Sequence, residues 1–249
     1  MMHYRDAAEK AARATGHLLM ANFQQPRRVS ASQPHDIKLA IDVEAQELIS
    51  QQLLGQFPAH ALYGEEGLVG DQTSEHQWVV DPLDGTVNYF YGIPHFCVSI
   101  ALRWKSEIIV GVIYDPVRDE MWTAQKGEKP MLNGQECHVS ERADLAEAVV
   151  AVGFSKTGET IAAGLPVLQQ MVYRARKCRL LGSAALDMAY VACGRLDAYI
   201  EQGISLWDIA AGWILVETAG GLVDMRPRPH VKDKYSAVVS NGVIDLKLG

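Results

Sequence analysis

The sequence predicts a layered α+β fold in which helices pack on sheets, with an antiparallel first half and an α/β second half. Two observations support this fold class. Helical patterns followed by short β-rich runs occupy residues 1–139, whereas strand and helix patterns alternate in residues 140–249. With 249 residues and 48% hydrophobic content, the chain can bury a large core. We expect two halves that meet between residues 139 and 140.

The first half is expected to begin with two helices and to continue with strands. Residues 4–24 are rich in alanine, and apolar residues recur at helical spacing over residues 41–53 before the chain reaches Gly55 and Pro58. Asn133-Gly134 is typical of a hairpin turn. Between these segments, β-rich runs separated by short polar turns predict strands at residues 78–80, 96–104, 108–115 and 120–124.

The second half is expected to alternate between strands and helices. Its helices should end where glycine follows an apolar periodic segment, because glycine commonly terminates helices. Strands are predicted at residues 148–154, 178–182, 196–202 and 236–241, and helices at 159–173, 183–194 and 208–220.

The composition is that of a soluble globular protein. No segment reaches the 18 or so apolar residues that a membrane span needs, and the N-terminal segment lacks the apolar run of a signal peptide, so we expect a cytoplasmic protein without a membrane partner. The net charge of −7 argues against general nucleic-acid binding. The cysteines are widely spaced, which favours buried free thiols at Cys97, Cys137, Cys178 and Cys193.

Residues 78–86, WVVDPLDGT, join a short apolar strand to two aspartates. Pro82 helps to turn the backbone sharply, so Asp81, Asp84 and the Leu83 carbonyl can converge on one point. Converging oxygens suit Mg²⁺, a hard cation that binds carboxylates and substrate phosphate oxygens. Taken alone, however, this segment could equally be an ordinary acidic turn.

The same segment also offers groups that could bind phosphate. Gly85 contributes to the turn, and Gly85 and Thr86 together supply backbone N–H groups and a hydroxyl at an expected helix start, where an anion is favoured. One short turn could therefore hold both a metal ion and a phosphate group.

Further carboxylates occur elsewhere in the chain. Glu65 and Glu66 stand between two glycines, and Asp208 precedes an apolar helix. In isolation these features would be a solvated turn and a helix N-cap. Together with Asp81 and Asp84 they make five carboxylates at turns, strand ends and a helix start. Like charges that are brought together destabilise one another, so such a group favours a bound cation.

The segments GEE, WVVDPLDGTVN and LWDIAAG, with ETAGG after the last, follow one another along nearly the whole chain. In these segments the sequence resembles the inositol monophosphatase family, which belongs with fructose bisphosphatases and related lithium-sensitive, Mg²⁺-dependent phosphatases. The resemblance implies an αβαβα layered fold and a homodimer. It also implies that two or three Mg²⁺ ions support hydrolysis of a small phosphorylated polyol or sugar, inositol monophosphate in particular, by two-metal activation of water.

By the same resemblance, Glu65, Asp81 and the Leu83 carbonyl would hold the first Mg²⁺. Asp81, Asp84 and Asp208 would hold the second, which makes Asp81 the bridging ligand. The second ion would stabilise the leaving alkoxide.

The resemblance also assigns catalytic and substrate-binding residues. Glu65, Thr86 and Asp84 would be catalytic, with Glu65 and Thr86 orienting the attacking water. Glu201 matches a position that accepts hydrogen bonds from sugar or inositol hydroxyls, and Ala184 matches a backbone contact in the same pocket. The implied substrate-binding residues are Asp84, Gly85, Thr86, Ala184, Glu201 and Asp208.

Asp42 matches an acidic position in the outer metal shell of the family. The sequence departs from the family pattern around it, because Leu39 and Ile41 stand where threonines are usual, and a lysine of the preceding loop has no clear counterpart. By the resemblance, binding of a third ion would depend on this region.

Several other activities of the same fold compete with inositol phosphate hydrolysis: fructose-1,6-bisphosphatase, nucleotide 3′-phosphatase and histidinol phosphatase. Val87-Asn88-Tyr89 resembles the inositol phosphatase pattern, whereas residues 92–96, GIPHF, are similar to members that also cleave fructose bisphosphate. A phosphatase with an aspartyl nucleophile would need two aspartates separated by one residue, and here two residues separate them. A non-enzymatic regulatory or RNA-associated member of the family is the remaining alternative.

The other conspicuous residues are interpreted as structural. We assign no role to His95, because it has no partner at ligand spacing. Arg27-Arg28 are expected in a loop. Apolar periodic segments place three tryptophans in the core, and a charged run is interpreted as a solvated edge: Trp104, Trp122 and Trp213, then Arg174, Arg176, Lys177 and Arg179.

Overall fold

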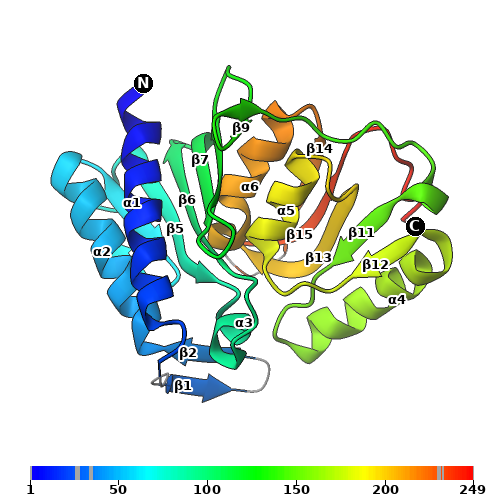
Figure 1. Ribbon diagram of the computed structural model, residues 1–249, viewed down its shortest axis with the longest axis horizontal. Coiled ribbons are helices and arrows are strands. Elements are labelled where there is room, and N and C mark those ends of the chain that lie inside the picture. The colour runs from blue at the N-terminus through cyan, green and yellow to red at the C-terminus, as the bar shows by residue number, and fades with distance from the viewer. Residues whose placement is uncertain (1, 26–28, 34–35, 229–230, 232, 249) are drawn as a thin grey trace.

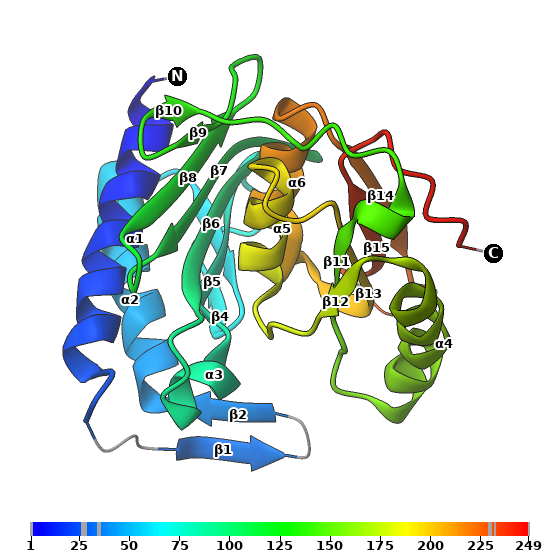
Figure 2. The same ribbon diagram turned by 45° about the vertical axis from the view of Figure 1, so that its right-hand side comes forward.

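Two β-sheets separate three helical layers in the computed structural model (Figures 1 and 2). The structure describes residues 2–25, 29–33, 36–228, 231 and 233–248. The sequence of layers is helices, an eight-stranded sheet, helices, a five-stranded sheet and a final helix. This is the αβαβα order that the family resemblance implies.

The first helical layer consists of α1 (Met2–Asn22) and α2 (Ala40–Gln56), as the two predicted helices require. Both pack on the outer face of the larger sheet. Alanines on one side of α1 permit close approach, since Ala8, Ala11 and Ala12 are fully buried. A short hairpin of β1 (Val29–Gln33) and β2 (Asp36–Leu39) connects the helices and was not predicted.

The larger sheet is antiparallel except for the parallel pair β3 and β5, which largely confirms the prediction for the first half. Its spatial order is β10-β9-β8-β7-β6-β5-β3-β4. The strands are β3 (Ala61–Gly64), β4 (Gly67–Val69), β5 (His76–Asp84), β6 (Cys97–Trp104), β7 (Glu107–Asp115), β8 (Glu120–Gln125), β9 (Met131–Leu132) and β10 (Gln135–Glu136). Asn133 and Gly134, both at positive φ, form the predicted turn between β9 and β10.

The smaller sheet has the order β12-β11-β13-β15-β14. β11 is parallel to β12 and β13, whereas β15 runs antiparallel to β13 and β14. The strands are β11 (Val149–Val152), β12 (Lys177–Arg179), β13 (Ala198–Ser205), β14 (Leu222–Pro227) and β15 (Lys234–Ser240).

The remaining helices cover both faces of the smaller sheet. α5 (Ala184–Ala192) and α6 (Leu206–Thr218) lie between the sheets, and α4 (Gly158–Arg174) covers the outer face. A short helix, α3 (Thr86–Tyr91), follows β5, and a 3₁₀ turn, Leu145–Glu147, precedes β11.

One buried cluster joins the two halves. It contains Val79 and Trp122 from the larger sheet, Tyr199 and Val239 from the smaller one, and most of α5 and α6 between them. Burial of this apolar surface is the main favourable contribution to packing the halves together. The division between residues 139 and 140 stays a prediction.

Some expectations about individual residues need correction. Trp104 was predicted to be in the core, but it is 41% exposed, because it is the last residue of β6, where it stacks on His76 of the neighbouring strand β5. Trp122 is fully buried as predicted, and Trp213 is half-buried. The four cysteines are free thiols as expected. Cys97 is buried, whereas the other three are half-buried.

Among the described residues, no helix is long and apolar enough to cross a membrane.

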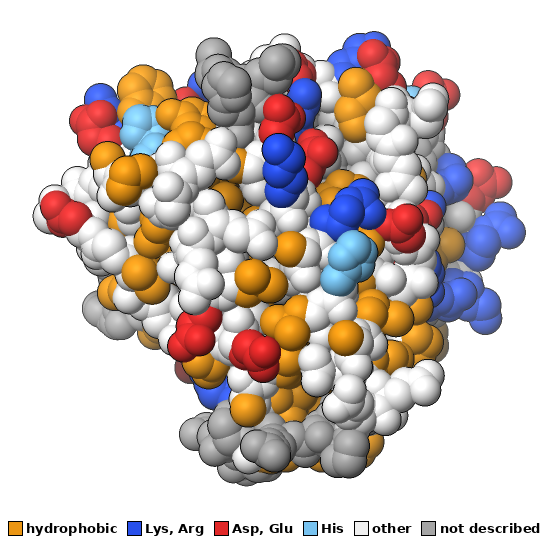
Figure 3. Space-filling model, turned by 60° about the vertical axis from the view of Figure 1, so that its left-hand side comes forward, with side chains coloured by type: hydrophobic (Ala, Val, Ile, Leu, Met, Phe, Trp, Pro, Cys, Tyr) orange, Lys and Arg blue, Asp and Glu red, His pale blue; other side chains and the backbone are white. Residues whose placement is uncertain are grey.

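Figure 3 shows a face on which acidic and basic side chains lie close together between hydrophobic ones. The basic run that begins at the last residue of α4 forms a largely solvated edge: Arg176, Lys177 and Arg179 are exposed, while Arg174 donates to the Leu246 carbonyl. Arg27-Arg28 lie outside the described residues.

Candidate active site

Asp81 and Asp84 stand at a break in the regular pairing of β5. Asp81 pairs with Ser99 and Asp84 pairs with Cys97, so three steps along β5 match two steps along β6. In a regular strand, residues three apart point to opposite faces. The extra residue is a β-bulge, which lets both aspartates serve the same side of the sheet. The Leu83 N–H donates to Asp81 Oδ1 at 3.0 Å and fixes this turn.

The turn from β5 into α3 requires Gly85. Its φ is +96°, and a Cβ atom there would lie 3.0 Å from the carbonyl oxygen of His95. Thr86 begins α3, and its hydroxyl donates to the Leu83 carbonyl at 2.9 Å. The segment Asp81–Thr86 is therefore one tightly folded turn, as the sequence predicts.

Glu65 is placed by the turn between β3 and β4. Its N–H donates to the Val80 carbonyl at 3.1 Å, which ties the turn to β5. The neighbouring Glu66 points elsewhere, because Lys38 Nζ lies 3.0 Å from its carboxylate. Gln46 on α2 also holds this turn by accepting the Glu66 N–H at 2.9 Å.

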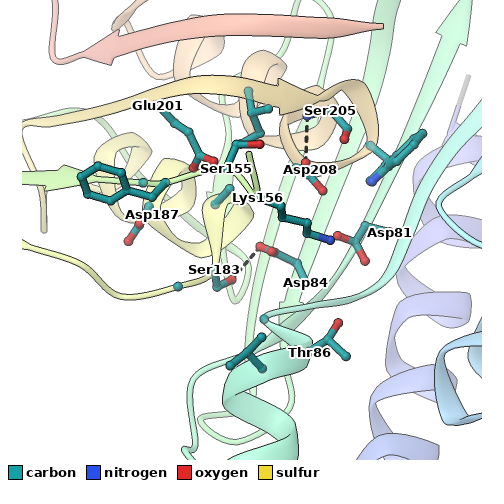
Figure 4. A pocket seen from close by; sticks show the side chains of 18 of the residues that line it. Asp81, Asp84, Thr86, Ser155, Lys156, Ser183, Asp187, Glu201, Ser205 and Asp208 are labelled. Carbon is teal, nitrogen blue, oxygen red and sulfur yellow. Dashed lines mark hydrogen bonds between the residues drawn. The ribbon is translucent and has the colours of Figure 1, made fainter. Parts of the chain in front are cut away.

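Asp208 is placed by the first turn of α6. Its Oδ2 accepts the Ser205 N–H at 2.9 Å, which satisfies one backbone donor at the helix start. The alternative of a plain helix N-cap does not apply to Asp208, since the cap is Ser205 and Asp208 is the third residue of the helix. The carboxylate still faces the turn of β5 (Figure 4).

Three of these carboxylates converge. One oxygen each from Glu65, Asp81 and Asp208 lies within 4.8 Å of the others. Asp84 is held at the edge of this group, because its Oδ2 accepts hydrogen bonds from the Ser183 hydroxyl at 2.6 Å and from the Ala185 N–H at 2.7 Å.

The clustered carboxylates perturb one another. Burial, followed by the charge of Asp208, raises the pKa of Glu65 to about 7. Burial, followed by the charge of Asp84, raises the pKa of Asp208 to about 6. Burial also raises the pKa of Asp84 to about 6 against the hydrogen bond from Ser183, and the pKa of Asp81 lies well above its usual range because of burial and the charge of Glu65.

This donor set fits a divalent metal ion. The converging atoms are carboxylate oxygens, the ligands that Mg²⁺ prefers, without the sulfur or imidazole groups that favour zinc or copper. A cation there would also offset the repulsion that raises these pKa values. Asp42, which matches the family's outer-shell position, accepts the Leu39 N–H at 2.7 Å at the start of α2, and its outer-shell role stays a prediction.

The carboxylates open into a pocket of about 330 Å³ between the two halves of the chain. All the predicted site residues line it: Glu65, Asp81, Leu83, Asp84, Gly85, Thr86, Ala184, Glu201 and Asp208. Figure 4 shows Glu201 away from Asp81, on the side formed by the smaller sheet.

Glu201 is anchored rather than free at a strand end. The Tyr199 hydroxyl donates to its Oε2 at 2.5 Å. Gly153 leaves room for the carboxylate, since a Cβ at that position would overlap Glu201 Oε2. Burial raises the pKa of Glu201 to about 7, opposed by the Tyr199 hydrogen bond.

Other pocket residues were not predicted as part of the site. Lys156, in the loop before α4, reaches to 3.9 Å from Glu65. Asn88 bridges the halves by donating to the carbonyls of His95 and Leu181, at 2.8 Å each. Ser183 and Asp187 lie close in sequence to Ala184, the one residue of this segment that was predicted to contact the substrate.

A layered αβαβα fold with an oxygen-only acidic cluster between its halves is the arrangement of the metal-dependent phosphatase class that the sequence resembles. The comparison with protein families confirms the resemblance, since the model of the inositol monophosphatase family matches residues 1–247. The chain belongs to this family, which is metal-dependent.

Similar curated proteins carry two kinds of name. "Nus factor SuhB" of Xylella fastidiosa is 43% identical over 218 residues, covering 86% of this chain and 78% of that protein. "Inositol-1-monophosphatase" of Mesorhizobium japonicum is 39% identical over 244 residues, covering 96% and 92%.

Solved structures agree with the fold. The extragenic suppressor protein SuhB of Bartonella henselae matches with a TM-score of 0.89 at 34% identity, covering 96% of this chain and 93% of that one. An inositol monophosphatase from Anabaena matches with a TM-score of 0.84 at 33% identity, covering 97% and 92%.

Proposed function

We propose that this protein hydrolyses a small phosphate monoester, inositol monophosphate in particular, with the help of Mg²⁺. The observation that carries the proposal is the position of the acidic cluster. Glu65, Asp81 and Asp208 converge at the wall of a pocket. Gly85 and Thr86 line the same pocket and form the turn that is expected to bind phosphate.

In the proposed site, Glu65, Asp81 and the Leu83 carbonyl hold one Mg²⁺, and Asp81, Asp84 and Asp208 hold a second. When bound, the ions supply positive charge that offsets the charge of the phosphate and of the leaving oxygen. The side chain of Asp84 is already oriented by Ser183, so the chain itself fixes one ligand before any ion binds.

The remaining roles belong to groups of the chain. Glu65 accepts the proton of the attacking water, and Thr86, whose hydroxyl is fixed on the Leu83 carbonyl, orients that water. The backbone N–H groups of Gly85 and Thr86 bind the phosphate oxygens. Glu201 accepts a hydrogen bond from a substrate hydroxyl, and the backbone at Ala184 contacts the same part of the substrate.

A second candidate function is regulatory. Curated relatives of similar identity are named Nus factors, which favours the regulatory or RNA-associated alternative. The complete set of acidic residues favours catalysis, because a purely regulatory protein has no need to keep several buried carboxylates together. The two functions are compatible on one chain.

A phosphate-release panel tests the proposed activity and its substrate class. Purified protein with Mg²⁺ would be assayed on inositol 1-phosphate, fructose 1,6-bisphosphate, 3′-phosphoadenosine 5′-phosphate, histidinol phosphate and a glycerol phosphate. We expect the highest kcat/KM on inositol 1-phosphate. A higher kcat/KM on one of the other substrates would make that compound the assigned substrate. No phosphate release from any of them would rule out the proposed hydrolysis and favour the regulatory function.

The family resemblance supports three further proposals. We propose that the protein is a homodimer, that Li⁺ inhibits it by occupying the second metal site, and that it acts in the cytoplasm on a small molecule.

A further inference from the structure

Asp187 is a buried acid that the proposed mechanism does not use. It lies in α5, is 2% exposed and lines the pocket. Among the described residues, none forms a hydrogen bond with its Oδ1, although that atom is buried. A buried polar atom without a partner costs about 1–3 kcal/mol, so such an atom in a pocket wall points to a ligand that supplies the missing partner.

The neighbours of Asp187 indicate the chemistry of that ligand. Asp187 and Glu201 lie on the same side of the pocket, away from Asp81 (Figure 4). The Tyr199 hydroxyl donates its proton to Glu201, so it has no second proton to donate to Asp187. Burial, followed by the charges of Asp84 and Glu201, raises the pKa of Asp187 well above its usual range.

A hydroxyl group suits this position better than a charged group does. It donates a hydrogen bond to a carboxylate and accepts one from a protonated carboxyl group, so it satisfies Asp187 in either state. A second anion would be repelled by Glu201. Asp187 is not one of the three carboxylates that converge among the described residues, which are Glu65, Asp81 and Asp208.

The first turn of α5 connects this position to the reacting centre. Ser183 and the Ala185 N–H hold the Asp84 carboxylate, and Asp187 lies only two residues further along the same helix. Asp84 and Asp187 also line the same pocket, so a substrate whose phosphate lies at Asp84 occupies the cavity that Asp187 borders.

We propose that Asp187 is a specificity-determining residue that, together with Glu201, binds neighbouring hydroxyl groups of a polyol phosphate. The proposal rests on the proposed phosphatase function and deepens it. It identifies the substrate class as phosphate esters that carry at least two free hydroxyls, and it excludes aryl phosphates as good substrates.

The test compares kcat/KM for inositol 1-phosphate and for 4-nitrophenyl phosphate, which has no hydroxyl on its leaving group. Asp187→Ala should lower kcat/KM for inositol 1-phosphate about tenfold to a hundredfold, since a lost hydrogen bond of about 1.4 kcal/mol is tenfold. The value for 4-nitrophenyl phosphate should change by less than about twofold. Asp187→Asn keeps the side-chain shape and one acceptor, so it should show a smaller loss in the same direction.

Gln125→Leu is the matched control. Gln125 also carries a buried oxygen without a hydrogen-bond partner, but it does not line the pocket. Its substitution should leave the ratio of the two kcat/KM values unchanged. Thermal unfolding of every variant checks that the fold is intact, and Asp187→Asn answers the question if Asp187→Ala does not fold.

An unchanged ratio in Asp187→Asn and Asp187→Ala would overturn the proposal and show that Asp187 is a structural acid. Equal losses on both substrates would also overturn it. If the wild type with Mg²⁺ hydrolyses neither compound, the proposed function fails as well, which distinguishes the two failures.

Discussion

Glu65 and Glu66 are adjacent in the sequence, yet the structure gives them different surroundings. Glu65 faces Asp81 and Asp208, while Glu66 pairs with Lys38 at 3.0 Å. The pKa of Glu65 rises to about 7 because of burial and the charge of Asp208, which is close to the value that suits a general base at neutral pH. This difference makes the pair a direct test of the assigned roles.

We predict that Glu65→Gln lowers kcat by about 10² to 10⁴, the usual contribution of a positioned base, while the protein stays folded. The control is Glu66→Gln, which should keep most of the activity. The measurement is phosphate release at saturating Mg²⁺. A kcat near wild type in Glu65→Gln would contradict the role, and full recovery with more Mg²⁺ would reduce Glu65 to a metal ligand.

Glu201 provides a second prediction for a single residue. Because Tyr199 fixes its carboxylate in the pocket, Glu201→Ala should depress kcat/KM for inositol 1-phosphate far more than for an aryl phosphate that lacks a hydroxyl. The two rates are measured side by side on the same preparation. Equal losses on both substrates would mean that Glu201 supports the fold or the metal site.

Single residues also show what the sequence could and could not predict. Asp81, Asp84 and Gly85 were predictable because proline and glycine mark the turn that gathers them. Lys156 and Asp187 were not, since Lys156 lies in the loop before α4 and Asp187 lies within α5, and neither residue is marked as part of a pocket by its local sequence pattern. Their placement depends on how the second sheet packs against the first.

At the level of elements, long periodic segments were predicted well and short strands were missed. α1 and α2 have strong helical patterns, so their predicted positions agree within a few residues. β4 is only three residues long and all three are exposed, and the edge strand β14, LVDMRP, contains charges and proline. Such strands depend on pairing with a neighbour rather than on their own sequence pattern.

An aromatic cluster anchors the outer helices to β5 and gives a prediction about pH. His60 stacks on Phe57 at 5.0 Å and on His76 at 4.7 Å between ring centroids. Burial, followed by the charge of His76, lowers the pKa of His60 to about 4. The folded protein therefore keeps His60 neutral at pH values where the unfolded chain, with a pKa of about 6.5, binds a proton.

The contribution of neutral His60 to the free energy of unfolding is fully present above a pH of about 6.5 and is lost as the pH falls toward 4. We predict that the wild type loses stability relative to His60→Phe across this window, because phenylalanine keeps the stacked ring without a titrating group. Free energies of unfolding from urea denaturation at several pH values would show the difference. Parallel curves for the two proteins would contradict the assignment.

At the scale of the whole molecule, the site exists only because two sheets meet. The larger sheet contributes Asp81 and Asp84, and the smaller one contributes Glu201 and leads into Asp208. Alternating patterns predicted the layered class, whereas the order of the five layers came from the family resemblance. No local sequence pattern determines which face of one sheet packs toward the other sheet.

The most direct test of this account is the metal dependence of phosphate release. Protein treated with EDTA would be assayed on inositol 1-phosphate while Mg²⁺ is added back, together with an Asp208→Asn variant. The clustered carboxylates of Glu65, Asp81 and Asp208 predict no release without metal, full recovery with Mg²⁺, and a much higher Mg²⁺ requirement in Asp208→Asn. Full activity of the metal-free protein, or an Asp208→Asn variant with the Mg²⁺ dependence of the wild type, would contradict it.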